Sequence, residues 1–306
     1  TSSAGIITAL LIIMGGATIS ALSGVGKGIK WLSNINMGLS FFVLIFFLLF
    51  GSTFFGLTNF FVGIWDYAIS VPGNMFTVWS ADGTPAGDAL SGWQSAWTIF
   101  YWAWWIAFAP FVGVFLARIS KGRTIREYIF GAMIIPSLMC FIWFALVGGT
   151  AIDLELSGVA NGAIANAGQA DKLFVLLNVI LGENLAYLMS LVIVVLLLTY
   201  LITSADSAVL IINTINAGGD DGPKARPHIL FWGIALALVV GGLIIAGGLS
   251  AIQTAMVIGA LPFSFVMVLM GISLIVAIVG DLERKKQGLQ TIYIEEDEAP
   301  VEAENG

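Results

Sequence analysis

The feature that most constrains this fold is a series of apolar stretches, each about as long as a membrane is thick. They lie near residues 4–22, 38–60, 94–117, 127–152, 184–212, 228–247 and 254–280. About twenty apolar residues in a helix cross the roughly 30 Å hydrocarbon layer of a bilayer. Charged residues make up 10% of the chain, whereas soluble domains carry about 25%. We therefore predict an all-α polytopic membrane protein with about seven transmembrane helices.

Lysine and arginine are distributed unevenly among the connections between these stretches. Eleven of the twelve basic residues occupy alternate connections, at Lys27, Lys30, Arg118, Lys121, Arg123, Arg126, Lys224, Arg226, Arg284, Lys285 and Lys286. Only Lys172 lies in a connection of the other set. Cytoplasmic connections of membrane proteins collect Lys and Arg. We therefore predict a multi-pass protein of the cell membrane, surrounded by lipid, with a cytoplasmic C-terminus.

The two ends of the chain differ in character. Residues 1–287 are predicted to form one transmembrane domain, and residues 288–306 form an acidic segment that we expect to be a disordered cytoplasmic tail. The chain begins with Thr1 rather than Met, and its first apolar stretch follows almost at once. We expect it to be the C-terminal part of a longer protein. No basic footprint for nucleic acid is present, so no nucleic-acid partner is expected.

The stretch from Trp97 to Gly113 is rich in aromatic residues and carries no formal charge. Residues three and four apart are neighbours on a helix. One face of a helix here carries Tyr101, Trp104, Trp105 and Phe108. Indole faces attract cations that cannot form hydrogen bonds, above all quaternary ammonium groups. A lipid-facing aromatic belt is the alternative, but belts occupy the ends of spans and this block reaches mid-span.

Polar residues inside the apolar stretch 184–212 form a second candidate group. Sodium binds oxygen ligands of low charge, which Thr203, Ser204 and backbone carbonyls near Tyr200 can supply. The alternative is that these hydroxyls bond to carbonyls of their own helix. Asp206 is the acid that lies clearly within an apolar stretch, and intramembrane carboxylates are functional candidates. We favour a structural pairing with Arg118 or Arg126 over a proton relay.

Three single residues also carry expectations about structure. Pro110 cannot continue the hydrogen-bond ladder of a helix, so a break near Ala109–Pro110 would expose carbonyl groups to a cation. Cys140 lies inside an apolar stretch and is expected to be inert packing. His228, the single histidine, is expected to be a loop–helix boundary residue, and no metal site is expected.

Four segments together resemble the betaine/choline/carnitine transporter family. They are Ser23–Asn34, Tyr101–Gly113, Ala117–Glu127 and Thr203–Ser207, with a weaker match at residues 148–151. The resemblance runs from about residue 5 to residue 287. It implies carriers of twelve spans, ten of which form two inverted five-helix repeats in a LeuT-like transporter fold. On that template the chain supplies the last seven spans, and a homotrimer is expected.

The resemblance also implies roles for individual residues. Trp105 faces the trimethylammonium group of the solute, Trp104 and Trp102 line the permeation path, and Phe100 and Tyr101 form its outer gate. Phe108 stands where the family often has Trp, so a sulfonium solute or ectoine is a reasonable substitute for betaine. The principal sodium site uses Thr203 and Ser204 near Tyr200, and a second uses Phe111. These are the residues we expect to bind the solute and sodium.

These observations predict a secondary active transporter rather than an enzyme. It would import a cationic or zwitterionic compatible solute of the glycine betaine, choline or carnitine type, in osmoprotection, by alternating access. Sodium is the expected coupling ion, and no other metal or cofactor is expected. A proton-coupled or exchange transporter of ectoine or dimethylsulfoniopropionate remains an alternative. A non-transporting membrane osmosensor is another.

Overall fold

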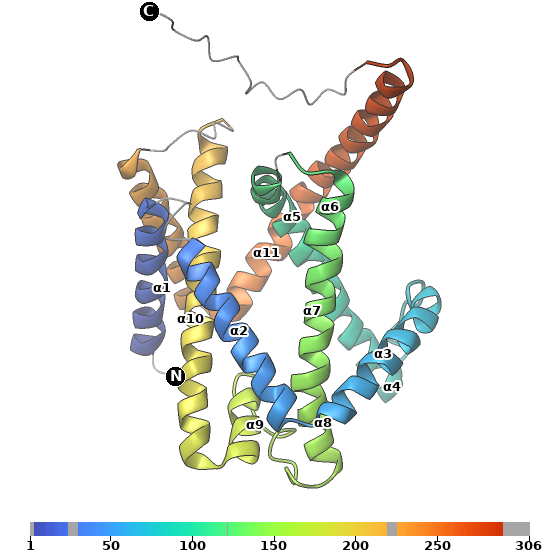
Figure 1. Ribbon diagram of the computed structural model, residues 1–306, viewed down its shortest axis with the longest axis vertical. Coiled ribbons are helices and arrows are strands. Elements are labelled where there is room, and N and C mark those ends of the chain that lie inside the picture. Colours follow the sequence, from blue (N-terminus) through green and yellow to red (C-terminus); the bar gives the residue numbers. More distant parts are fainter. Residues whose placement is uncertain (1–2, 24–29, 121, 219–224, 290–306) are drawn as a thin grey trace, which may run out of the picture. The chain divides into compact units, whose positions relative to one another are not determined.

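The computed structural model describes residues 3–23, 30–120, 122–218 and 225–289, with only the backbone described for Ser3 and Arg118. The regular elements in these ranges are all helices, and they include no strand (Figure 1). The predicted all-α class is confirmed. The predicted tail lies almost wholly outside the described residues, as does much of the segment Ser23–Asn34.

The helices vary widely in length. In chain order they are α1 (Ser3–Ser23), α2 (Lys30–Phe50), α3 (Thr53–Asn74), α4 (Pro85–Gln94), α5 (Phe100–Ile119), α6 (Ile125–Ile129), α7 (Ile135–Trp143), α8 (Gly149–Leu156), α9 (Lys172–Leu181), α10 (Glu183–Asn216) and α11 (Arg226–Lys286). Three π-helical segments join some of them: η2 (Ser95–Ile99), η3 (Phe130–Ile134) and η4 (Phe144–Gly148). The chain forms two compact units. The first is Thr1–Gly92 with Phe111–Ile252, and the second is Trp93–Pro110 with Gln253–Gly306.

Seven helices among the described residues are long and apolar enough to cross a membrane. Helix α11 counts once among them, although 61 residues of straight helix would be roughly 90 Å long, about three times the hydrocarbon thickness. Its backbone leaves helical geometry at Gly247 and Gly248, and Gly248 has a φ of 62°. Glycine adopts this conformation without steric cost. The break falls where the predicted spans 228–247 and 254–280 separate.

The predicted span 38–60 is wrong in its bounds. Helix α2 already begins at Lys30 and ends at Phe50, and a new helix begins at Thr53. The backbone N–H of Ser52 donates to Thr150 Oγ1 at 3.0 Å, which stabilises the chain at the break. Hydropathy does not register this turn, because the residues on both sides are apolar. Residues 62–74 continue α3, which is itself long and apolar enough to cross a membrane.

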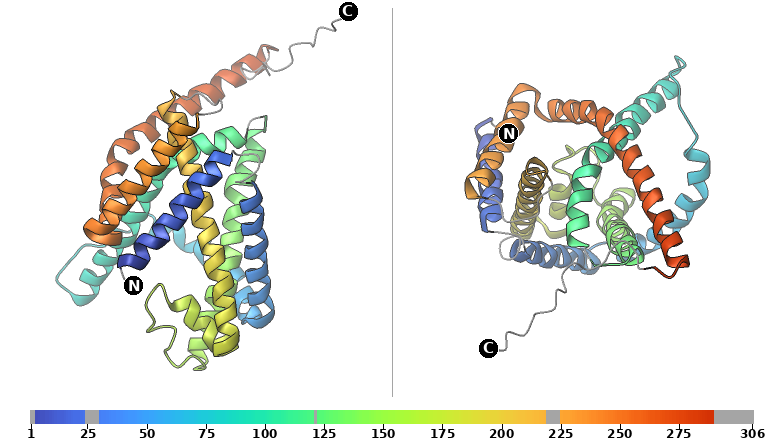
Figure 2. Two further views of the ribbon diagram at one scale, coloured as in Figure 1. Left: turned by 90° about the vertical axis from the view of Figure 1, so that its left-hand side faces the viewer. Right: turned by 90° about the horizontal axis from the view of Figure 1, so that it is seen from above.

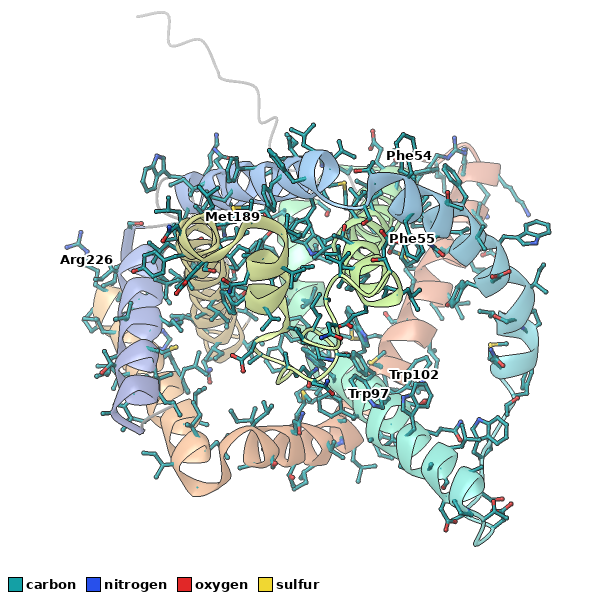
Figure 3. All side chains as sticks on the ribbon, turned by 90° about the horizontal axis from the view of Figure 1, so that it is seen from below. Phe54, Phe55, Trp97, Trp102, Met189 and Arg226 are labelled. Atoms are coloured by element: carbon teal, nitrogen blue, oxygen red, sulfur yellow. The ribbon has the colours of Figure 1, made fainter. Side chains whose placement is uncertain are left out.

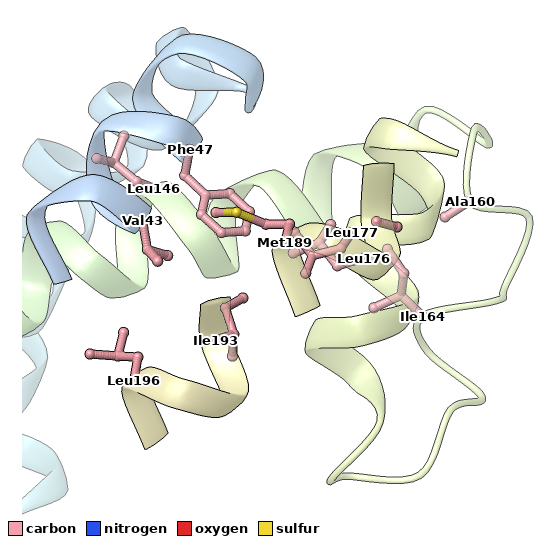
Figure 4. Packing of buried hydrophobic residues seen from close by; sticks show 11 residues of the cluster. Val43, Phe47, Leu146, Ala160, Ile164, Leu176, Leu177, Met189, Ile193 and Leu196 are labelled. Carbon is pink, nitrogen blue, oxygen red and sulfur yellow. The ribbon is translucent and has the colours of Figure 1, made fainter. Parts of the chain in front are cut away.

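The core of the first unit surrounds α10. Side chains from α2, η4, α9 and α10 form its main apolar cluster (Figure 4). Phe47 and Leu177 are fully buried there, and Met189 lies against the ring of Phe47. Burying a large apolar side chain contributes about 1.5–3 kcal/mol in water. Within a bilayer the same contacts act mainly through close packing.

A second contact region joins α1, α10 and the first part of α11 (Figure 2). Ala21, Val209 and Ile229 are its buried apolar residues. A methyl group on Gly233 of α11 would come within 2.6 Å of the Thr18 hydroxyl of α1. Small residues at such crossings let membrane helices approach closely. The first unit is therefore held together around α10 from several sides.

Glu155 organises the connection between α8 and α9. Its carboxylate accepts hydrogen bonds from the backbone N–H groups of Gly162, Ile164 and Ala165, at 2.8–2.9 Å. A carboxylate that accepts several N–H groups replaces the partners these groups would otherwise find in water. These hydrogen bonds therefore hold the α8–α9 connection to Glu155 at the C-terminal end of α8.

Two single-residue predictions can be compared with the structure. Cys140 is exposed on α7 rather than packed in the interior, so that expectation is wrong. An apolar neighbourhood in sequence does not show which face of a helix a residue occupies. His228 lies in the first turn of α11, as predicted for a boundary residue. Its Nε2 accepts a hydrogen bond from Trp232 Nε1 at 3.2 Å.

Replacing Gly56 by Ala should lower stability, by about 1–3 kcal/mol, as overpacking does in tight contacts. The new Cβ would stand 2.6 Å from the carbonyl oxygen of Ala145. Gly63 on the same helix has no atom within 4 Å of the equivalent position, so Gly63→Ala is the matched control. Thermal unfolding of the detergent-solubilised protein measures both. Equal midpoints for the two variants would contradict the tight crossing of α3 and η4.

Candidate functional site

An aromatic hollow lies along one side of the helical stretch from Trp93 to Trp105, within the second unit. Its volume is about 640 Å³, and it is lined by Trp93, Trp97, Thr98, Tyr101, Trp102 and Trp105. Figure 3 labels Trp97 and Trp102, which lie close together beside the ribbon of this helix. Pockets for small molecules commonly measure about 300–1,000 Å³ and are largely apolar. Five aromatic side chains and Thr98 form the lining.

The π-helical segment η2 sets the register of these side chains. Its hydrogen bonds run from residue i to i+5, so each turn is wider than an α-turn and residues four apart lie more nearly in line. The Trp97 and Tyr101 rings accordingly stack with centroids 5.8 Å apart and planes 15° from parallel. Offset stacking of this kind suits the charge distribution of aromatic rings. Trp93 lies one further step of four along the same line.

The predicted solute-binding residues divide between two sides of α5. Tyr101, Trp102 and Trp105 line the hollow. The ring of Trp104 packs 5.8 Å from the rings of both Phe100 and Tyr101, and neither Trp104 nor Phe100 belongs to the lining. Phe108 is half-exposed and lies beyond it. The predicted common face of Tyr101, Trp104, Trp105 and Phe108 is therefore divided.

Two of the tryptophans that line the hollow are largely exposed. The side chain of Trp105 is 64% exposed and that of Trp102 is 67% exposed. Their ring faces remain accessible, as a cation–π contact within about 6 Å requires. All the lining residues belong to one helical stretch. The hollow thus presents a binding face from one side rather than a closed cage.

The expected break at Pro110 does not occur. Helix α5 continues through Pro110 from Phe100 to Ile119. Proline removes one backbone donor, but its φ suits a helix, and neighbouring structure in a membrane protein compensates a single lost bond. Phe111, predicted for a second sodium site, is half-buried on α5 and takes no part in the α2–α10 hydrogen bonds described next.

Polar side chains join α2 to α10 within the first unit. Asn36 Nδ2 donates to Thr203 Oγ1 at 3.2 Å, and the Thr203 hydroxyl donates to the Tyr200 carbonyl at 2.9 Å. One turn along α2, Ser40 Oγ lies 2.9 Å from the Tyr200 hydroxyl. Ser204 is exposed beside them. The structure therefore places predicted ion ligands at a polar contact between two helices, with Thr203 also bonded within its own helix.

Asp206 is fully buried and bonded to serine hydroxyls. Ser20 Oγ of α1 donates to Asp206 Oδ2 at 2.6 Å, and Ser207 Oγ lies 3.2 Å from Oδ1. The expected pairing with Arg126 is wrong, since the Arg126 side chain is exposed and makes no ion pair with Asp206 among the described contacts. The Arg118 side chain lies outside the described part of the chain. Hydroxyl donors bind this carboxylate instead.

A comparison with known families decides what kind of protein this is. The sequence profile described as BCCT, betaine/carnitine/choline family transporter, matches residues 1–282. The chain belongs to the betaine/carnitine/choline transporter family. The resemblance inferred from the sequence is confirmed. Members of the family are multi-pass membrane transporters and not enzymes. The predictions of a multi-pass membrane protein and of a protein that is not an enzyme are therefore confirmed as well.

Individual members of the family differ in the solutes they are named for. Over 254 residues the chain is 40% identical to an ectoine/hydroxyectoine transporter of Virgibacillus pantothenticus, covering 82% of this chain and 48% of that one. It is 38% identical over 256 residues to the glycine betaine transporter OpuD of Bacillus subtilis, covering 84% and 48%. It is 36% identical over 272 residues to the osmo-independent choline transporter BetT1 of Acinetobacter baylyi, covering 88% and 50%. The chain spans about half the length of these curated relatives.

The structure adds residues that sequence reasoning missed. Trp93 and Thr98 line the hollow, although the π-helical register that brings them there is invisible in an α-helical projection. Asn36 and Ser20 supply the cross-helix hydrogen bonds to α10. Ser20 lies inside the predicted span 4–22, so a polar residue in an apolar stretch could have signalled it. Asn36 lies two residues before the predicted span 38–60 and gave no such signal. Their partners could not be read from the sequence.

Replacing Ser20 by Ala should destabilise the packing of α1 on α10, because it removes a donor from a buried carboxylate. The expected cost is about 1–3 kcal/mol. Ser23→Ala is the matched control, since among the described residues the Ser23 hydroxyl donates to the Ser20 carbonyl of its own helix. Asp206→Asn keeps an acceptor oxygen for Ser20 and should cost less than Ser20→Ala. Unfolding midpoints in detergent test the order, and a Ser20→Ala midpoint equal to that of Ser23→Ala would contradict it.

Proposed function

We propose that the chain acts in a secondary active transporter that imports a quaternary-ammonium or related compatible solute across the cell membrane. Transport would proceed by alternating access and be coupled to sodium entry. The observation that carries the proposal is the aromatic hollow along the helical stretch from Trp93 to Trp105, in a member of a transporter family. The two parts of the proposal, solute recognition and ion coupling, rest on separate groups of residues.

The chemistry of the hollow supports a methylated cation as the solute. A quaternary ammonium group has no N–H to donate, so carbonyl or carboxylate acceptors gain little from it beyond charge attraction. Aromatic faces attract it through their negative quadrupole, and Trp does so most strongly. Four of the six lining residues are tryptophans. Trp105, Trp102 and Tyr101 are the contacts we propose for the cationic group, with Trp104, Phe100 and Phe108 along the path.

Two observations bear on the choice among related solutes. The relatives described above are named for ectoine, glycine betaine and choline, which share a delocalised or methylated cationic centre. Phe108 offers a weaker ring face than Trp would. We propose that the protein accepts more than one compatible solute, with betaine, choline, carnitine and ectoine as the candidates for measurement.

The polar contact between α2 and α10 supports sodium as the coupling ion. Thr203 and Ser204 carry adjacent hydroxyl groups, and no Lys or Arg side chain is described beside them. The Tyr200 carbonyl accepts a hydrogen bond from the Thr203 hydroxyl. Hard cations take oxygen ligands of this kind. We propose these three residues for the principal sodium site and Phe111 for a second one. The buried Asp206 favours proton coupling as the alternative, since intramembrane carboxylates serve proton relays in many transporters.

The orientation and assembly of the protein are proposed on sequence grounds. The alternate distribution of Lys and Arg supports a cytoplasmic C-terminus. A homotrimer rests on the family alone. Accessibility of an epitope tag on the C-terminus, in intact and permeabilised cells, tests the orientation.

Replacing Trp105 by Ala should weaken solute recognition. The solute concentration for half-maximal uptake should rise about 2- to 30-fold, the range expected for losing one cation–π contact, and Trp105→Phe should lie between Ala and the parent. Uptake of radiolabelled glycine betaine, choline, carnitine and ectoine by the complete natural gene product in proteoliposomes measures this. Trp65 on α3 is similarly exposed, at 67%, and lies outside the hollow, so Trp65→Ala is the control. An unchanged value for Trp105→Ala would overturn its assignment.

Replacing Thr203 by Val should weaken sodium binding, because Val keeps the shape of Thr and lacks its oxygen. The sodium concentration for half-maximal uptake should rise about tenfold or more, as for a lost contact to a charged group. Thr199→Val is the control on the same helix, since the Thr199 hydroxyl bonds to carbonyls of that helix. Uptake driven by a proton gradient without sodium would contradict sodium coupling and favour Asp206.

A further inference from the structure

Asn36 is a buried amide whose side chain reaches from one helix to another. It is 4% exposed, in the second turn of helix α2, and its Nδ2 donates to Thr203 Oγ1 on α10. A buried amide is costly unless hydrogen bonds compensate its lost hydration. The Asn36 N–H donates to Thr203 Oγ1, so the effect of Asn36 lies in how this hydrogen bond constrains the Thr203 hydroxyl.

The bond from Asn36 removes a freedom that a helical threonine normally has. Threonine in a helix divides between two χ1 rotamers, because its hydroxyl can bond to the carbonyl of residue i−3 or of residue i−4. In this structure the Thr203 hydroxyl donates to Tyr200, the i−3 carbonyl. Only a rotamer that holds Oγ1 toward α2 can also accept from Asn36. The amide therefore favours one of the two positions of the Thr203 oxygen.

The hydrogen bonds from Asn36 and to Tyr200 also determine which lone pair of Thr203 Oγ1 stays available to an ion. A hydroxyl has one hydrogen and two acceptor lone pairs. At Thr203 the hydrogen points to the Tyr200 carbonyl and one lone pair receives the Asn36 N–H. The remaining lone pair has a fixed direction. An oxygen held in this way offers only an acceptor, as a cation requires.

One turn along α2, a second hydrogen bond joins Ser40 to Tyr200 of α10. Ser40 Oγ donates to the Asn36 carbonyl at 2.7 Å, which leaves the Tyr200 hydroxyl as the donor in its 2.9 Å contact with Ser40. Asn36 and Ser40 are four residues apart and share one face of α2. That face thus contacts both Tyr200 and Thr203 of α10.

We propose that Asn36 is a positioning residue for ion binding: from α2, its amide N–H holds the Thr203 hydroxyl in the rotamer whose free lone pair binds sodium. The inference rests on the proposed role of Thr203 as a sodium ligand. It adds a residue that does not itself touch the ion. It also places part of the control of ion affinity on α2 rather than on α10.

Asn213 provides a matched control for Asn36. It is fully buried on α10, and its Nδ2 donates to the Val209 carbonyl of its own helix at 2.7 Å. Among the described side chains, both asparagines bury an Oδ1 atom without a hydrogen-bond partner. The two residues therefore share burial and chemistry and differ in whether the N–H crosses to another helix. Replacing either by Leu removes a buried amide while keeping the number and branching of the side-chain heavy atoms.

The test measures sodium binding in the complete natural gene product. Binding of radioactive sodium to the purified protein gives sodium affinity without a solute, and uptake in proteoliposomes gives solute affinity at saturating sodium. Asn36→Leu should weaken sodium binding about 3- to 10-fold, as for one lost hydrogen bond, and leave the solute affinity at saturating sodium within twofold. Asn213→Leu should leave sodium binding unchanged. If Asn36→Leu does not reach the membrane, Asn36→Ser removes the same donor with a hydroxyl that a helix interior tolerates.

A double-mutant cycle with Thr203→Val separates positioning from general damage. If Asn36 acts through Thr203, the double variant Asn36→Leu/Thr203→Val should bind sodium no more weakly than Thr203→Val alone. Additive losses, or unchanged sodium binding in Asn36→Leu and Asn36→Ser, would overturn the inference while leaving the proposed function intact. Unchanged sodium binding in Thr203→Val, or a parent that binds no sodium, would instead overturn the proposed sodium site itself.

Discussion

Polar groups within an apolar membrane helix need partners on neighbouring helices, and this requirement shapes the first unit around α10. Tyr200, Thr203 and Asp206 follow one another at intervals of three residues, so they form a polar line along α10. The partners of this line come from two different helices: Asn36 and Ser40 of α2, and Ser20 of α1. A bilayer offers no water to replace any of these bonds. The polar line therefore fixes which helices stand beside α10, and the apolar cluster packs around that arrangement.

The aromatic stretch of α5 follows a different physical rule. Each ring carries at most one polar atom, so its faces can stay exposed with few hydrogen-bonding groups in need of a partner. What the sequence must provide there is alignment, and the π-helical segment η2 provides it by widening one turn. Trp97 and Tyr101 stack as a result, and the lining continues to Trp105. Local backbone geometry, rather than contacts with distant helices, produces this face.

The difference between these two rules explains what could be predicted from sequence. The all-α class, the family and the span positions other than 38–60 followed from hydropathy and motif spacing, because these signals are local. The turn at Gly51–Ser52 was missed because its stabilising partner, Thr150, is distant in sequence. The Ser20 partner of Asp206 was missed for the same reason, and arginine was expected because charge is the easiest complement to see in a sequence. The division of Trp104 from Trp105 was missed because spacing along a helix does not show which rings pack on one another, and the Trp104 ring packs on Phe100 and Tyr101.

In the proposed function, the aromatic hollow must bind the quaternary ammonium group and the Thr203–Ser204 hydroxyls must bind sodium, although the two cations carry the same charge. The difference in their hydration makes this discrimination possible. Sodium gives up its water only where oxygens replace it, so tryptophan faces hold it poorly. A quaternary ammonium group holds water weakly and donates no hydrogen bond, so fixed hydroxyls such as Thr203 would lose their hydration without gaining a partner. Each group therefore rejects the ligand of the other through an unsatisfied interaction as much as it attracts its own. Separate chemistries, one of rings and one of oxygens, give this selectivity without requiring a counter-charge buried beside either ligand.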